Sequence, residues 1–156
     1  MKSKFFIIAT MSLLLMNSCK KDSTAPPVGP GGPTTTAFKA ILTGSQEVPT
    51  HSSNASGTLD GSYNSSTMVF NYSITYKTVS GTTFNPTVAH IHKGLPGVDG
   101  NAVIAFDLGA VAASPHTGTI ILTATQFADF KNGLYYVHIH SNIFPEGDIR
   151  GQIELK

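Results

Sequence analysis

The chain has 156 residues, a formal net charge of +1 at pH 7 and a single cysteine. It contains one arginine, Arg150, and no basic stripe, so its charge pattern argues against nucleic acid as a partner. The single cysteine excludes a disulfide framework and a zinc site built from several thiolates. The chemistry of this chain therefore has to come from other side chains.

Residues 1–18 have the pattern of an export signal. Lys2 and Lys4 precede an apolar run over residues 5–16, which is too short for a spanning helix of about 20 residues. Cys19 follows directly, as in a bacterial lipoprotein signal, where the thiol takes the lipid. We predict a lipoprotein signal peptide over 1–18 and lipidation at Cys19. The alternative is an ordinary secretory signal in which Cys19 has no role.

Residues 19–36 are rich in Pro, Gly, Thr and Ser, and Val28 is the only large apolar side chain among them. Such a segment buries too little apolar surface to offset its ordering entropy, so we predict a flexible tether. The partner that this arrangement predicts is a membrane, reached through a lipid anchor. We expect an outer-membrane-anchored lipoprotein of the cell envelope, either periplasmic or surface-exposed.

Residues 37–156 have the length of one domain, and a period of two dominates their hydrophobic pattern. The clearest run is 68–76, where large apolar side chains alternate with smaller residues. Runs of this kind, separated by Gly, Pro, Asn and Ser, predict strands at 38–43, 56–63, 68–76, 88–92, 102–108, 118–122, 134–140 and 149–155. We therefore expect an all-β fold, an antiparallel Greek-key-like β-sandwich of about eight strands.

One short helix should interrupt these strands after residue 122. Thr123 and Gln126 have the spacing of a capping box, in which each side chain bonds the other residue's backbone N–H. Phe127 and Phe130 then form an apolar stripe, and Gly133 provides a C-terminal stop. We predict that this helix closes one end of the sandwich.

The sequence His-Ile-His occurs twice, as His90 to His92 and as His138 to His140. Residues two apart in a strand share a face, so each pair of histidines should lie together. The apolar residues between and beside them should turn to the core, which places both pairs on the outer face. If the last strand is a neighbour, Arg150 and Gln152 join the four histidines in one polar patch.

Two histidines at this spacing on a rigid strand suit a metal ion, because their rings can converge and a neighbouring strand can supply a third ligand. Imidazole favours Zn, Cu, Fe or Ni, and Zn or Cu is the ion that we expect here. A catalytic zinc takes three protein ligands and a water, whereas a structural zinc takes four. Asp148, Glu146 or a backbone carbonyl could fix the ring tautomers. The alternative is that the rings only hydrogen-bond to each other or to the backbone of a half-exposed sheet.

Five motifs in order resemble the CHRD domain, a family first described in chordin and widespread in exported bacterial proteins. They are Gln46-Glu47-Val48-Pro49 at the start, followed by the segments 54–61, 89–108, 122–141 and 144–153. The resemblance implies one CHRD domain over 37–156 with histidines at 90, 92 and 140. The family usually has Asn where this chain has His138, so a site shared by the family would use the other three.

The His-x-His strand beside a Gly-rich loop is also similar to copper/zinc superoxide dismutase, a Greek-key β-sandwich with metal ligands outside its barrel. The chain lacks the cysteines that brace that enzyme, and its bridging histidine and zinc-site aspartate have no counterpart that we can place. Fold analogy of this kind does not establish a function.

Two hypotheses about function follow, and they leave open whether the protein is an enzyme. The first is a non-catalytic module at the cell envelope that binds an unidentified protein or small ligand. The second is a protein that binds Zn or Cu through His90, His92 and His140, with His138 or water completing the shell, and that could be dismutase-like. A third, purely structural role would use Arg150 and Gln152 to fix the histidine strands.

Overall fold

The computed structural model describes residues 32–81, 83–106 and 114–156. The predicted signal peptide, Cys19 and most of the tether lie outside these residues, as does the end of the strand predicted at 102–108. The described part forms one compact unit, and no helix in it is long and apolar enough to cross a membrane.

Nine antiparallel strands form a single sheet in the order β5-β4-β7-β8-β1-β2-β3-β6, with β9 paired to β1. Three neighbouring pairs join strands that are distant in the chain, namely β4 with β7, β8 with β1, and β3 with β6. The strands are β1 (Thr35–Thr43), β2 (Ala55–Asn64), β3 (Val69–Thr78), β4 (Pro86–Lys93), β5 (Ala102–Phe106), β6 (His116–Ile121), β7 (Tyr135–Ser141), β8 (Ile149–Gln152) and β9 (Glu154–Leu155). A 3-10 turn, η1 (Gly44–Gln46), follows β1.

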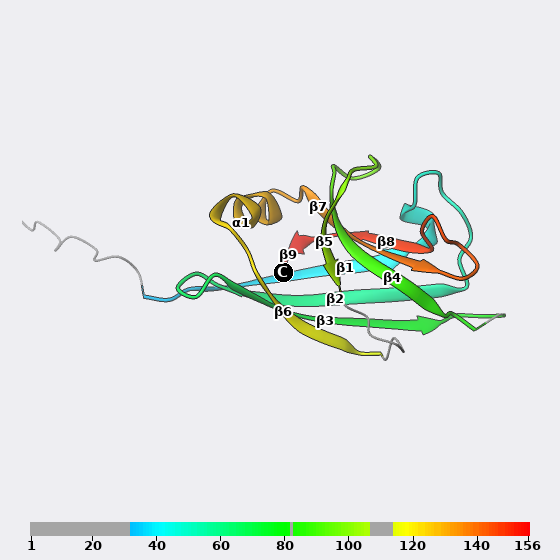
Figure 1. The fold of residues 1–156 in the computed structure, drawn as a ribbon, viewed down its shortest axis with the longest axis horizontal. Helices are drawn as coiled ribbons and strands as arrows, with labels where there is room; N and C mark the ends of the chain where they lie inside the picture. The colour runs from blue at the N-terminus through cyan, green and yellow to red at the C-terminus, as the bar shows by residue number, and fades with distance from the viewer. Residues whose placement is uncertain (1–31, 82, 107–113) are drawn as a thin grey trace, which may run out of the picture. The chain divides into compact units, whose positions relative to one another are not determined.

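The sheet curls so that its two halves face each other across one core (Figure 1). Phe38, Leu59 and Phe70 from one half share this core with Ile91 and Val137 from the other, and all five side chains are fully buried. The ring of Tyr72 in β3, the last strand but one in this order, meets that of Phe106 in the first strand, β5, with centroids 4.8 Å apart. The fold is thus the all-β, sandwich-like class that the alternating pattern predicts.

All eight predicted strands are present, with two differences. The last one divides at Ile153 into β8 and β9, and the backbone N–H of Ile153 donates to the carbonyl of Tyr135 in β7. Met68, predicted as the first residue of its strand, instead lies before β3 with a positive φ of 58° and is exposed. Its carbonyl accepts a hydrogen bond from the Leu122 backbone, so Met68 is part of a turn and does not belong to the core.

The predicted helix is α1 (Ala124–Lys131), and its capping box is present. Thr123 Oγ1 accepts from the Gln126 backbone, and the Gln126 side chain accepts from the Thr123 backbone. Phe130 packs edge-on against Phe38 and Phe70 in the core, so the helix covers one end of the curled sheet, as predicted (Figure 1).

Strands β4, β7 and β8 are neighbours, as the polar patch requires. Their register places His90 opposite His138, and His138 opposite Arg150. The next row consists of His92, Tyr136 and Gln152. His140 pairs with Val88 at the other side. The two His-Ile-His segments therefore lie side by side in antiparallel strands.

Candidate metal centre

The four histidines share the face of the sheet that points away from the core. Ala89, Ile91, Val137 and Ile139, which alternate with them, are fully buried in the core cluster. The prediction from the period of two is therefore confirmed for both strands.

Loops cover part of this outer face, which the strand pattern does not indicate. His138 is 7% exposed and Arg150 only 2%. Three connecting segments lie over the patch: 44–54 after β1, 94–101 after β4 and 142–148 after β7. Their contacts with the patch, described below, come from distant parts of the chain, so strand periodicity alone could not indicate them.

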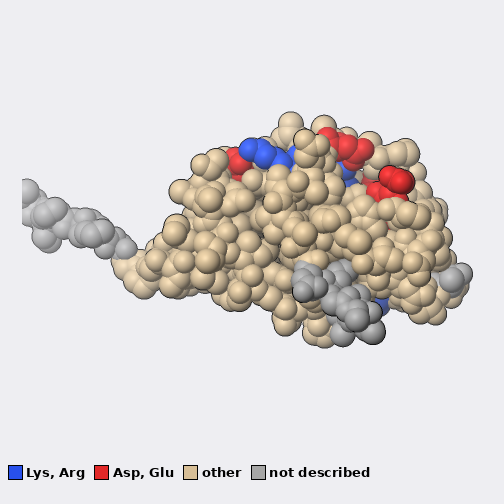
Figure 2. Space-filling view, in the orientation of Figure 1, with Lys and Arg blue, Asp and Glu red and all other residues tan. Residues whose placement is uncertain are grey.

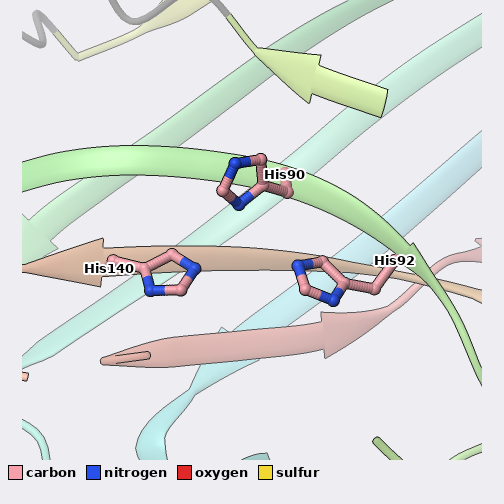
Figure 3. Close-up of side chains that lie close together, drawn as sticks. All are labelled: His90, His92 and His140. Atoms are coloured by element: carbon pink, nitrogen blue, oxygen red, sulfur yellow. The ribbon is translucent and has the colours of Figure 1, made fainter. Parts of the chain in front are cut away.

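His90, His92 and His140 lie around one common space (Figure 3). We call these three residues the histidine cluster. Each offers one ring nitrogen, and the three nitrogens lie within 4.8 Å of one another. Two nitrogens bound to one ion at about 2.1 Å can be at most about 4.2 Å apart, so small ring rotations bring the cluster to coordination distance. The cluster combines two residues of β4 with one of β7, and each ring is half-buried.

Backbone carbonyls fix the tautomers of two of these rings. His92 Nδ1 lies 2.8 Å from the carbonyl oxygen of Gly100, and His140 Nδ1 lies 2.8 Å from that of Pro145. A carbonyl oxygen can only accept, so both Nδ1 atoms carry the proton and both Nε2 atoms present a lone pair. Both Nε2 atoms are buried and have no hydrogen-bond partner among the described residues. This is the orientation that metal-binding histidines adopt.

The surroundings of the cluster keep its histidines in the uncharged form. Burial lowers the pKa of His90, His92 and His140 below the usual 6.5, and repulsion from neighbouring histidines lowers it further. The carbonyls of Gly100 and Pro145 oppose this effect on their rings, but burial is the larger cause. The three rings are therefore neutral at pH 7, which is the form that binds metal.

His138 is turned to a different partner, Glu47. Its Nε2 lies 3.0 Å from Glu47 Oε2, and both side chains are buried. This separation is that of an ion pair, but its angles are not those of a hydrogen bond, and both ring nitrogens lack a hydrogen-bond partner among the described residues. His138 is adjacent to the cluster, with its ring centroid 4.3 Å from that of His140, but it does not belong to the converging group.

Gly147 makes the approach of Glu47 and His138 possible. A Cβ atom at this position would lie 1.8 Å from His138 Nε2, and its φ of +143° is rarely adopted by other residues. The same residue's carbonyl lies 3.1 Å from His51 Nε2, and the His51 ring stacks on Phe144. These contacts join the 44–54 segment to the 142–148 loop.

Asp148 does not orient a histidine, although it was a candidate for that role. Its carboxylate accepts hydrogen bonds from Ser53 and Ser141. It therefore holds the ends of the 142–148 loop and the 44–54 segment, and Pro145 supplies the carbonyl that orients His140.

Arg150 and Gln152 fix the 94–101 loop over the patch. One terminal nitrogen of Arg150 donates to Asp99 at 3.0 Å, and the other donates to the Val98 carbonyl at 2.9 Å. Its guanidinium stacks on the ring of Tyr136, 3.6 Å from the centroid. Gln152 Nε2 donates to the carbonyls of Gly94 and Gly133. Both residues lie in the predicted patch, but they contact loop atoms rather than the histidines.

Two side chains of the site, Tyr136 and Glu47, are not predicted from the sequence, and the backbone carbonyl expected to fix the tautomers is predicted without its position. Tyr136 stacks on His92, with centroids 5.0 Å apart, and its hydroxyl accepts from the Gly100 N–H. The alternation in β7 could have revealed it, because Tyr136 has the same parity as His138. Glu47 belongs to a recognised motif, but nothing in its position indicates a histidine partner. The carbonyls of Gly100 and Pro145 are backbone atoms and leave no sequence signal.

The fold and the site together define a class: a sandwich-like all-β domain with a histidine cluster on a loop-covered sheet face. The family model of the CHRD domain matches residues 38–153, a range that contains the whole cluster and both loops that orient it. The chain therefore belongs to the CHRD domain family. A search of the curated proteins and a search of the solved structures each found no match.

Proposed function

We propose that this protein is a lipid-anchored CHRD-domain module of the cell envelope that binds one transition-metal ion through the histidine cluster. The family assignment is consistent with a binding module rather than with a particular reaction. The observation that carries the metal proposal is the convergence of three imidazole nitrogens. In His92 and His140, a carbonyl bonded to Nδ1 leaves Nε2 with a lone pair for the ion.

The donor set favours zinc or copper. All three donors are imidazole nitrogens, which suit Zn, Cu, Fe and Ni, and no thiolate or carboxylate of a described residue belongs to the converging group. Ca²⁺ and Mg²⁺ prefer oxygen ligands, so they fit this cluster poorly. Three protein ligands leave a fourth position open for water or another small ligand.

The decisive test is metal analysis of the full chain purified without a polyhistidine tag. We expect about one equivalent of Zn or Cu after reconstitution, and a large loss of affinity in H90A, H92A and H140A. H116A is the matched control, because His116 is a half-buried histidine of β6 outside the converging group. Circular dichroism should show that all four variants keep their β structure. Binding below about a tenth of an equivalent, even after reconstitution, would sink the proposal.

A substitution of His138 distinguishes a metal centre of three histidines from one of four. Because its Nε2 lies against Glu47, the variant H138N should keep one metal equivalent and lose less than about tenfold in affinity, as expected for an outer contact. A loss as large as that of H140A would show that His138 is a ligand, and the three-histidine geometry would be wrong.

The anchor is a separate part of the proposal and rests on the sequence of residues 1–19. Cells grown with radiolabelled palmitate should incorporate label into the wild-type chain but not into C19S, and C19S should leave the membrane fraction. The variant S18A is the control, because it alters the adjacent residue but keeps the thiol. Equal labelling of C19S and wild type would exclude lipidation at Cys19 without affecting the metal proposal.

A further inference from the structure

A cavity of about 380 Å³ opens directly beside the histidine cluster. His90 and His140 form one wall, and Thr87, Val88, Asn142 and Pro145 contribute to the others. Two ligands of the proposed ion thus border a space large enough for a small molecule.

The cavity is the side from which the proposed ion can take an external ligand. On the side of His92, the ring of Tyr136 stacks on the imidazole and the Gly100 carbonyl binds Nδ1. On the side of His138, the carboxylate of Glu47 occupies the neighbouring space. Neither His92 nor His138 lines the cavity, whereas His90 and His140 both do.

The charges around the cluster favour an anion in the open position. Three neutral imidazoles leave the double charge of the metal uncompensated. Glu47 and Glu146 are the carboxylates that act on His140. Glu47 is already paired with His138, and Glu146 is exposed, so water and salt screen its charge. Among the described residues that line the cavity, the histidines are the only side chains that can carry a charge.

The walls also indicate the kind of anion. Thr87 and Asn142 are exposed polar residues whose side chains have no hydrogen-bond partner among the described residues, so both can donate to a ligand. The Ser141 hydroxyl, in contrast, already donates to Asp148. Val88 and Pro145 give the same cavity an apolar side. A small aliphatic carboxylate fits this cavity. One of its oxygens would coordinate the ion, the other would accept a hydrogen bond from a wall residue, and its short tail would contact the apolar side.

We propose that the metal-loaded histidine cluster takes a small aliphatic carboxylate as its fourth ligand, through the cavity lined by Thr87, Val88, Asn142 and Pro145. The inference rests on the proposed metal function and names the ligand class of that site. It makes the protein a metal-dependent binder of carboxylates rather than a store for the ion alone.

The experiment uses the full chain, purified without a polyhistidine tag and loaded with Co²⁺ as a coloured substitute for zinc. Its visible absorption reports the ligands of the ion. Titration with sodium acetate at constant ionic strength should change this spectrum saturably, and butyrate should bind more tightly because its extra methylenes contact Val88 and Pro145. Removing one donor, in T87V or N142A, should weaken acetate binding about three- to tenfold.

T117V is the matched control, because Thr117 is also an exposed threonine near the start of an outer strand, β6, but lies away from the cavity. It should bind acetate like the wild type, and all three variants should keep the wild-type affinity for Co²⁺. Acetate binding that T87V and N142A leave unchanged would overturn the assignment of the cavity.

Different experimental outcomes would overturn the metal function and the carboxylate inference. Absence of Co²⁺ from the cluster would overturn the metal function and this inference together. Bound Co²⁺ whose spectrum does not respond to acetate or butyrate would overturn the inference and leave the metal function intact. Release of Co²⁺ on adding carboxylate, detected by gel filtration, would also count against a fourth-ligand site.

Discussion

The substitution R150M tests whether the loop over the histidine patch is held by one buried guanidinium. Arg150 lies in β8 beneath the 94–101 loop, and its terminal nitrogens reach Asp99 and the Val98 carbonyl. Methionine keeps much of the apolar stem but removes every donor and the charge that stacks on Tyr136. The loop should then lose its attachments to Arg150, while the bond from Gln152 to Gly94 remains.

The expected loss of unfolding free energy is the sum of three contacts, which contribute different amounts. The buried bond from the charged guanidinium to the Val98 carbonyl contributes about 2 kcal/mol. The stacking on Tyr136, in a desolvated position, contributes about 1 kcal/mol. The pair with Asp99 contributes less than about 1 kcal/mol, because that carboxylate is 63% exposed and screened by water. Together they give about 3–4 kcal/mol, or roughly 10–15 °C in Tm for a domain of this size.

Urea denaturation followed by circular dichroism measures this loss, and D99N isolates the exposed pair. We expect D99N to cost less than about 1 kcal/mol. Because the loop carries the Gly100 carbonyl that orients His92, R150M should also weaken metal binding by roughly tenfold. If R150M were no less stable than D99N, the buried bonds to the loop would contribute nothing and the reasoning would be refuted.

Three further predictions concern the surroundings of the cluster and the helix. G147A should cost about 2–4 kcal/mol in thermal denaturation, because its Cβ would overlap the His138 ring; G97A, also at positive φ but with no atom near its Cβ, should cost only about 1 kcal/mol. Burial lowers the pKa of the cluster histidines below 6.5, so the unfolded chain binds more protons as pH falls through that value. The metal-free protein should therefore lose stability below pH 6.5 until the folded histidines also protonate, and the triple variant with glutamine at all three positions should lose less. T123A should cost about 1 kcal/mol of unfolding free energy through loss of the N-cap, with the exposed T117A as its control.

The sequence predicts the strands and the facing of the histidines because both depend on local periodicity. His90 and His92 share a face for the same reason that Ala89 and Ile91 share the core. The capping box of α1 is equally local and is also found as predicted. Met68 shows the limit of the pattern, because its alternation continues into a turn where φ is positive and the side chain leaves the core.

The cover over the site depends on contacts between distant segments, which periodicity does not contain. Glu47 meets His138 from 91 positions away in the sequence, and Gly100 and Pro145 act through backbone carbonyls. A histidine pair on a strand therefore predicts a candidate site, but the tautomer, burial and open side of that site come from the loops. For this reason three of the four histidines form the cluster, and the fourth, His138, forms a separate pair with Glu47.

The hydrogen-bond state of the patch distinguishes residues that support the fold from residues arranged for a ligand. Both terminal nitrogens of Arg150 have partners and Gln152 bonds two carbonyls, so these residues support the fold by holding a loop. The cluster is the opposite case, because Nε2 of His92 and Nε2 of His140 are buried and have no hydrogen-bond partner in the described part of the chain. An unpaired buried polar atom costs about 1–3 kcal/mol, and apolar residues at these positions would avoid that cost. Stability alone does not account for the cluster, whereas coordination of an ion would use the lone pairs that the fold leaves unpaired.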